Sequence, residues 1–169
     1  MYAELCEKYN NEFPKGSPFI VACQFNRLKD VKLFIESGRV DVNTTTGKNS
    51  KGKNAGYTAL MTAVEEEHSE LVKFLIGLPS TDVSVVREGY GFNSIHLAAR
   101  SSKTSLDILN LLLAHETCTE DVLNKQTDDC LGHTPTDYAF SNTGSFRKEI
   151  TALLKSKGGK CTLFQAKKK

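Results

Sequence analysis

The sequence predicts an all-α fold made of about four stacked helix pairs. Two observations support this class: the chain contains copies of one local pattern, and each copy continues into a segment with apolar residues at helical spacing. A single helix pair cannot bury its own apolar face, so successive pairs are expected to stack on one another and share a continuous core. The copies are unequal in length, since Gly56 and Gly91 are 35 residues apart whereas Gly91 and Gly132 are 41 apart.

The first half of each copy reads as a short helix. Pro18 and Pro135 suit the first turn, where a missing N–H has no intrahelical partner, and Thr58 and Thr134 can cap a helix by accepting a backbone N–H. Each copy places one small residue where neighbouring helices must approach closely. The four first halves are 17–22 (SPFIVA), 56–63 (GYTALMTA), 91–99 (GFNSIHLAA) and 132–139 (GHTPTDYA).

The second half of each copy reads as a helix with one apolar face. Val31, Phe34 and Ile35 recur at helical spacing in the first copy, and the later copies repeat the pattern. Gly38 and Gly158 come just after two of these segments, where a left-handed residue ends a helix at low cost. The four second halves are 31–38, 68–76, 108–113 and 150–158.

These segments together resemble the ankyrin repeat. Residues 96–99 (HLAA) and Thr134-Pro135 match parts of its Thr-Pro-Leu-His-x-Ala pattern, and residues 40–43 (VDVN) match its end. Ile20, Met61 and Asp137 replace the histidine of the pattern. The resemblance covers roughly residues 16–158, with repeats at about 16–43, 56–84, 91–124 and 132–158. It implies an ankyrin-repeat solenoid of stacked helix–turn–helix pairs with projecting β-hairpin-like fingers.

The segments outside the repeats are expected to form caps and loops. Residues 1–15 should hold an amphipathic capping helix at 2–12, because apolar residues recur there at i, i+3, i+4 and i+7. Residues 159–169 form a basic tail, in which Leu163 and Phe164 either fold back onto the last helix or fray, and we expect fraying. Residues 44–55 (TTTGKNSKGKNA) form a polar insertion, which is either a solvated loop or a basic finger for an acidic partner.

The resemblance implies binding of a partner protein through a concave groove and the fingers. Three aromatic residues beside the repeat-start glycines, Tyr57, Tyr90 and Phe92, are either packing residues or binding anchors. The run Glu65 to Glu67 is either a solvated face or an acidic groove, whose extent Arg100 would limit. The candidate partner-binding residues are Gln24, Phe25, Asn54, Tyr57, Glu65, Glu66, Tyr90, Phe92, Arg100, Ser101, His133, Ser141 and Asn142.

A zinc site is the competing interpretation. His115, Cys118, Cys130 and His133 have spacings that could close a tetrahedral site, although the repeat register favours coincidence. If present, the metal would be structural. Small-ligand or peptide binding in the groove is a further alternative. No phosphate-binding glycine loop, nucleophile elbow or His-Glu-x-x-His helix is found, so we expect neither an enzyme nor a cofactor.

Composition limits which class of partner and which cellular compartment we expect. Hydrophobic residues make up 39% of 169 and charged residues 25%, as in an ordinary globular chain, and no apolar run is long enough to span a membrane. The net charge of +2 includes six lysines after residue 154, which leaves −4 for residues 1–154 and gives no case for nucleic-acid binding. Five scattered cysteines and the lack of a signal-peptide pattern favour the cytoplasm or nucleus, and a monomer is the default expectation.

Overall fold

The computed structural model describes residues 1–12, 17–46, 55–87, 89–101, 106–129 and 131–163. Within these ranges the regular structure is helical, with no strand. The chain divides into two compact units, Met1–Thr81 and Asp82–Lys169, which are called unit 1 and unit 2 below. The division falls near the end of the second predicted repeat, 56–84.

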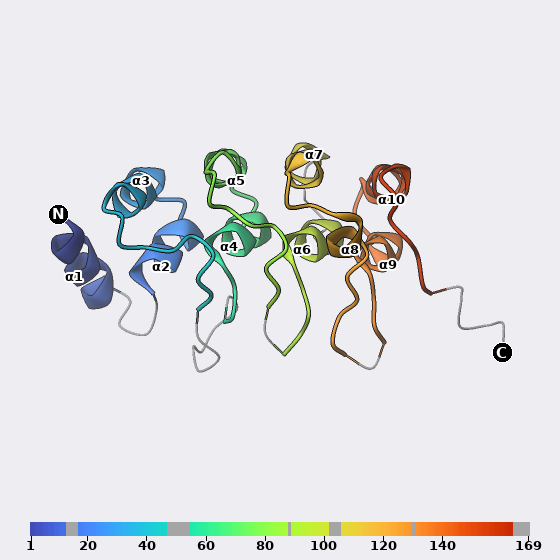
Figure 1. Ribbon diagram of the computed structural model, residues 1–169, viewed down its shortest axis with the longest axis horizontal. Coiled ribbons are helices and arrows are strands. Elements are labelled where there is room, and N and C mark those ends of the chain that lie inside the picture. Colours follow the sequence, from blue (N-terminus) through green and yellow to red (C-terminus); the bar gives the residue numbers. More distant parts are fainter. Residues whose placement is uncertain (13–16, 47–54, 88, 102–105, 130, 164–169) are drawn as a thin grey trace. The chain divides into compact units, whose positions relative to one another are not determined.

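Unit 1 contains two helix pairs preceded by one helix. In Figure 1, α2 and α4 lie in one layer of this unit, and α3 and α5 lie in the other. Helix α2 packs against both α3 and α4, and α4 packs against α5. The five helices are α1 (Tyr2–Glu12), α2 (Pro18–Gln24), α3 (Leu28–Glu36), α4 (Ala59–Glu65) and α5 (Ser69–Ile76).

Helix α1 is the helix predicted for residues 2–12, and it covers the first pair. Its apolar face buries Leu5 and Tyr9. The Tyr9 ring lies 5.9 Å from the Phe34 ring, and its hydroxyl donates a hydrogen bond to the Asp30 carboxylate at 2.6 Å. The apolar ring therefore joins the core while its polar tip keeps a partner, as a buried tyrosine requires.

Unit 2 contains two further pairs in the same two-layer arrangement (Figure 1). Helix α6 packs against α7 and α9, and α9 packs against α10. A four-residue helix, α8, lies in the long connection between α7 and α9; the Thr119 hydroxyl caps it by accepting the Val122 N–H at 3.4 Å. The helices are α6 (Ser94–Arg100), α7 (Leu106–Ala114), α8 (Glu120–Leu123), α9 (Pro135–Ser141) and α10 (Arg147–Ser156).

The predicted helix-start and helix-end signals are confirmed. Thr58 accepts the Met61 N–H at 3.1 Å, and Thr134 accepts the Asp137 N–H at 3.3 Å. Pro18 and Pro135 are the first residues of α2 and α9. Gly38 and Gly158 follow α3 and α10 with φ of +65° and +94°.

The fingers are hairpin-like loops whose two arms are joined by a backbone hydrogen bond. The bonds run from Thr46 N to Tyr57 O at 3.0 Å, from Arg87 N to Phe92 O at 2.6 Å and from Thr127 N to His133 O at 3.0 Å. In unit 2 the fingers also touch each other, since Asp128 N donates to Tyr90 O at 3.0 Å. Most of the polar insertion, residues 47–54, lies outside the described residues.

The expectation that the chain frays at Leu163 was wrong. Residues 159–163, the C-terminal strap, lie against α8 and α9 through hydrogen bonds of the backbone. Lys160 N donates to the Asn124 side-chain oxygen at 2.7 Å, and Thr162 N and Leu163 N donate to the Asp137 carboxylate at 2.7 and 3.2 Å. A buried carboxylate needs donors, and the strap supplies them. Phe164 lies outside the described residues.

Candidate functional site

Unit 2 carries a cluster of aromatic rings between a finger and the α6–α9 layer. Phe92 lies 5.3 Å from Tyr138 and 5.6 Å from His96, and Tyr138 lies 5.5 Å from His133, as distances between ring centroids. Phe92 and His133 come from finger arms, whereas His96 and Tyr138 come from α6 and α9. Phe92, His133 and Tyr138 are half-buried, so the cluster presents part of its rings to solvent. We call these four residues the aromatic cluster.

Two arginines extend this surface. The Arg100 guanidinium lies 5.6 Å from the Phe92 ring centroid, and the Arg87 guanidinium lies 4.0 Å from that of Tyr90. Tyr90 is 51% exposed and Leu131, in the next finger, is 66% exposed. The aromatic cluster, Arg100, Tyr90 and Leu131 are referred to below as the unit-2 surface. Its chemistry is apolar and cationic.

His96 holds the cluster in place. Its Nε2 lies 3.3 Å from the His133 carbonyl oxygen, which can only accept, so this contact requires a proton on Nε2. Its Nδ1 lies 3.2 Å from Asn93 N and 2.7 Å from Asn93 Oδ1, at the capping box of α6. The side chain is fully buried, and this burial lowers its pKa to about 4. His96 therefore stays neutral at physiological pH and joins the start of α6 to the following finger.

Tyr138 retains its hydroxyl proton over the physiological range. Burial is the main cause of its raised pKa, and the negative charge of Asp129 raises it further. A half-buried ring with a protonated hydroxyl can give a partner both apolar area and a hydrogen-bond donor.

Unit 1 presents a different surface at the C-terminal ends of α2 and α4. Phe25, directly after α2, is 48% exposed. The Gln24 carbonyl oxygen accepts a hydrogen bond from His68 Nε2 at 3.0 Å, which holds the end of α2 beside the turn that follows α4. Glu65 and Glu66 are half-buried at that turn. This unit-1 surface is apolar and acidic.

Two candidate binding residues are buried in the structure. Tyr57 is only 2% exposed, so of the two alternatives for this aromatic the structure favours packing over partner contact. Asn142 is 7% exposed, and its side-chain amide donates to the backbone oxygens of Ala99 at 3.0 Å and Ser101 at 2.7 Å. Ser101 is half-buried and Ser141 exposed, whereas Asn54 lies outside the described residues.

Sequence reasoning missed Tyr138 and Leu131. Tyr138 follows Asp137 as Leu97 follows His96 in the preceding copy, and Leu97 is fully buried. An aromatic residue at the corresponding place in the last copy was the available signal. Leu131 carried a weaker one, since it is a large apolar residue in an otherwise polar loop.

The zinc interpretation gains no support from the part of the chain that the structure describes. His115 Nδ1 lies 2.9 Å from the Thr117 hydroxyl, and Cys130 is outside the described residues. Among the described residues, no group of three or more His, Cys, Asp or Glu side chains is arranged to hold a metal ion. Likewise, none of the described helices has the length and apolar character needed to cross a membrane.

Helix pairs in two layers, fingers closed by backbone bonds, and exposed aromatic groups at the fingers define a repeat protein whose surface is suited to recognition. A family model for ankyrin repeats (3 copies) matches residues 3–86 and 20–125. The chain therefore belongs to the ankyrin-repeat family, and its fold is an all-α ankyrin solenoid. Ankyrin repeats in general mediate protein–protein interaction. No curated protein matches the chain.

Proposed function

We propose that this protein is an interaction module, acting as an adaptor, scaffold or inhibitor, that binds a partner protein through the unit-2 surface. The observation that carries the proposal is the aromatic cluster. Its Phe92, His133 and Tyr138 rings remain half-exposed, although Leu97 and Ala98 of α6 are fully buried.

The chemistry of the unit-2 surface suits a protein partner. Tyrosine and arginine are enriched among the residues that dominate binding energy, because they give large contact area together with directional polar groups. Arg100 beside Phe92 and Tyr138 beside His133 combine these features. The rings are also held by the hydrogen bonds of His96, so binding should cost little ordering of the surface.

The unit-1 surface is proposed as a second contact region. Phe25 offers an exposed aromatic ring, and Glu65 and Glu66 place negative charge at the end of the neighbouring helix. A basic, partly apolar segment of a partner fits this chemistry.

A binding role without catalysis is also part of the proposal. The buried titratable groups of the repeat starts, His96 and Asp137, are used in capping boxes of α6 and α9. A neutral histidine locked between two backbone groups is poorly placed to act as a general base. We further propose that the protein works as a monomer without a cofactor, in the cytoplasm or nucleus, where its cysteines would remain reduced.

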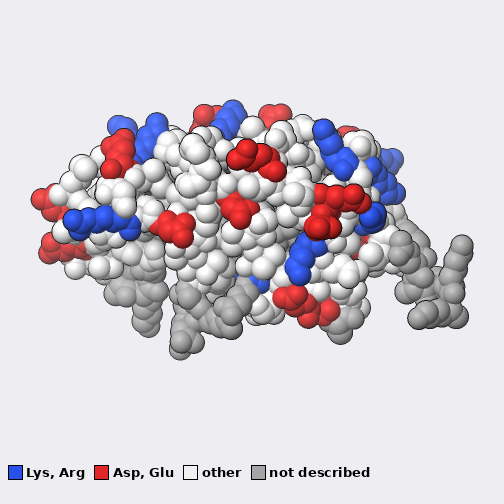
Figure 2. All heavy atoms as spheres, in the orientation of Figure 1, with Lys and Arg blue, Asp and Glu red and all other residues white. Residues whose placement is uncertain are grey.

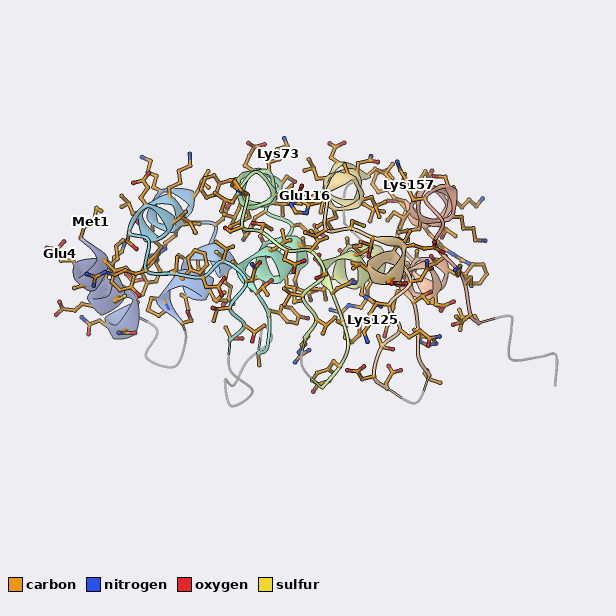
Figure 3. All side chains as sticks on the ribbon, viewed as in Figure 1. Met1, Glu4, Lys73, Glu116, Lys125 and Lys157 are labelled. Carbon is orange, nitrogen blue, oxygen red and sulfur yellow. The ribbon has the colours of Figure 1, made fainter. Side chains whose placement is uncertain are left out.

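The test is a quantitative pull-down from lysate of the source cells, with the wild-type protein and three variants compared by mass spectrometry. The first variant, Tyr90→Ala/Arg100→Glu/Tyr138→Ala, alters the unit-2 surface. The second, Phe25→Ala/Glu65→Lys/Glu66→Lys, alters the unit-1 surface. The matched control is Lys73→Glu/Asp107→Lys, whose exposed positions lie on α5 and α7. Figure 3 shows Lys73 projecting from α5. Circular dichroism must show that all four proteins are folded.

A partner retained by the wild type and the control, and depleted at least tenfold by the unit-2 variant, is the expected result. Depletion by the unit-1 variant alone would move the binding region to that surface. Equal retention by all variants would contradict the proposed surface, and the insertion at 44–55 would then be tested by deletion.

A further inference from the structure

A separate hollow lies on unit 2, between the end of α9 and the outer side of α10. It has a volume of about 410 Å³ and is lined by Phe140, Arg147, Lys148, Thr151, Ala152 and Lys155. Among the described residues that line it, Phe140 is the aromatic one, and it is half-buried. The Arg147 guanidinium lies 4.9 Å from the Phe140 ring centroid, so the hollow combines an apolar wall with cations.

The lining residues of α10 form one continuous stripe. With about 100° of rotation per residue, 147, 151 and 155 follow one another on the helix surface, and 148 and 152 lie beside them. The buried residues Ile150 and Leu154 border the stripe on its Arg147 edge, toward α9 and the core. Glu149 is exposed but falls outside the stripe and does not line the hollow.

The hollow carries strong positive charge without internal compensation. Arg147, Lys148 and Lys155 are exposed, no acidic residue lines the hollow, and within the described residues no ion pair joins these three cations to a carboxylate. Figure 2 shows Lys and Arg side chains gathered at the end of unit 2 where α10 lies. The nearby Lys160 is different, because its ammonium pairs with Glu120 at 2.8 Å. Three cations that make no ion pair among the described residues, together with an apolar wall, favour an anionic ligand that also has apolar groups.

The hollow is distinct from the unit-2 surface. Phe140 and Tyr138 are two residues apart on α9, so their side chains point about 200° apart around the helix axis. Tyr138 contacts the Phe92 and His133 rings, whereas Phe140 contacts Arg147 of α10. A ligand of the hollow and a ligand of the unit-2 surface therefore need not compete with each other.

We propose that this hollow binds an acidic peptide segment of a partner protein, with an apolar side chain against Phe140 and Ala152 and flanking carboxylates on Arg147, Lys148 and Lys155. Charge complementarity favours carboxylates at the rim. The apolar wall favours a peptide side chain over a bare anion, because a bare anion would make no apolar contact with Phe140 and Ala152. Binding should weaken with added salt, since the cations are exposed and screened.

The experiment measures fluorescence anisotropy of a labelled short peptide of Glu and Asp residues with Leu-Phe at its centre. Lys148→Glu/Lys155→Glu should weaken binding at least tenfold, because it reverses the charge at the rim. The matched control, Lys29→Glu/Lys32→Glu, makes the same change of net charge on the exposed side of α3 and should bind as the wild type does. The unit-2 surface variant should also bind normally, which separates this site from the proposed function.

The apolar half of the proposal is tested with a second probe in which Gly-Gly replaces Leu-Phe. Phe140→Leu, which keeps an apolar side chain for packing, should weaken binding of the Leu-Phe probe and leave the weaker Gly-Gly probe unaffected. Equal affinity of the two probes for the wild type would overturn the role of Phe140. Equal loss in Lys29→Glu/Lys32→Glu would show a non-specific charge effect, and displacement of the peptide by millimolar inorganic phosphate at constant ionic strength would show a site for a bare anion. Either result overturns the proposal.

Discussion

The Asp137 carboxylate accepts both the backbone N–H and the hydroxyl of Thr162, at 2.7 and 2.6 Å. The same carboxylate accepts the Thr134 N–H at 2.9 Å and so closes the capping box of α9. The Asp137 side chain therefore both caps α9 and holds the C-terminal strap. Burial alone would raise its pKa, but hydrogen bonds from Cys161, Thr162, Thr134 and Leu163 outweigh burial and lower the pKa well below its usual range.

Replacing Asp137 with Ala should lower the free energy of unfolding by about 3 kcal/mol, because several buried donors lose a charged acceptor together. Urea denaturation followed by circular dichroism measures this change. Asp107→Ala, at an exposed position on α7, is the control and should change stability by less than about 0.5 kcal/mol. Thr162→Val combined with Asp137→Ala completes a double-mutant cycle, and additive effects would show that the two residues are not coupled.

Stability should fall as the pH is lowered from about 6.5 to about 4, because of His96. The folded protein keeps this histidine neutral down to a pKa of about 4, whereas an unfolded histidine binds a proton below about pH 6.5. The unfolded state then binds more protons, which costs about 3 kcal/mol across this range. Urea midpoints at several pH values measure the loss. His96→Gln should flatten this part of the profile and His115→Gln should not; an unchanged slope in His96→Gln would contradict the assignment.

The contact between the two fingers of unit 2 should be sensitive to a single methyl group. A Cβ at Gly91 would lie 2.8 Å from Asp128 N, and Gly91 also has φ of +69°. Gly89 has φ of +77° but open space around its Cβ position. Gly91→Ala should therefore cost about 3 kcal/mol and Gly89→Ala about 1 kcal/mol in urea unfolding, since only the first adds a backbone clash to left-handed strain. Equal losses of stability in Gly91→Ala and Gly89→Ala would show that the two fingers separate freely.

Replacement of the two finger tyrosines, Tyr57 and Tyr90, should have different effects on stability and on partner binding. Tyr57→Ala removes a buried ring and should cost about 4 kcal/mol of stability. Tyr90→Ala removes an exposed ring and should change stability by less than about 0.5 kcal/mol while weakening capture of the partner. Thermal unfolding together with the pull-down measures both effects. A strong loss of stability in Tyr90→Ala would place that residue among the packing groups.

Local signals in the sequence were sufficient for the fold. Pro18, Thr58, Thr134 and Pro135 specify helix starts through interactions within a few residues, and the apolar spacing specifies which side of each helix is buried. Repetition of these signals then determined that the helix pairs stack. None of these features depends on a distance between remote parts of the chain.

Only the tertiary structure decided which residues form the surfaces. Tyr57 and Tyr90 both flank a repeat-start glycine, Tyr57 after Gly56 and Tyr90 before Gly91, yet Tyr57 is buried and Tyr90 is exposed. The Phe92–Tyr138 contact and the Asp137–Thr162 bonds join residues that are 46 and 25 positions apart, so their existence depends on how successive pairs and the strap pack. The sequence by itself predicted a helical repeat protein of a family that in general mediates protein–protein interaction. Tertiary packing determined which side chains remain exposed, since burial is a property of the stack rather than of any one repeat.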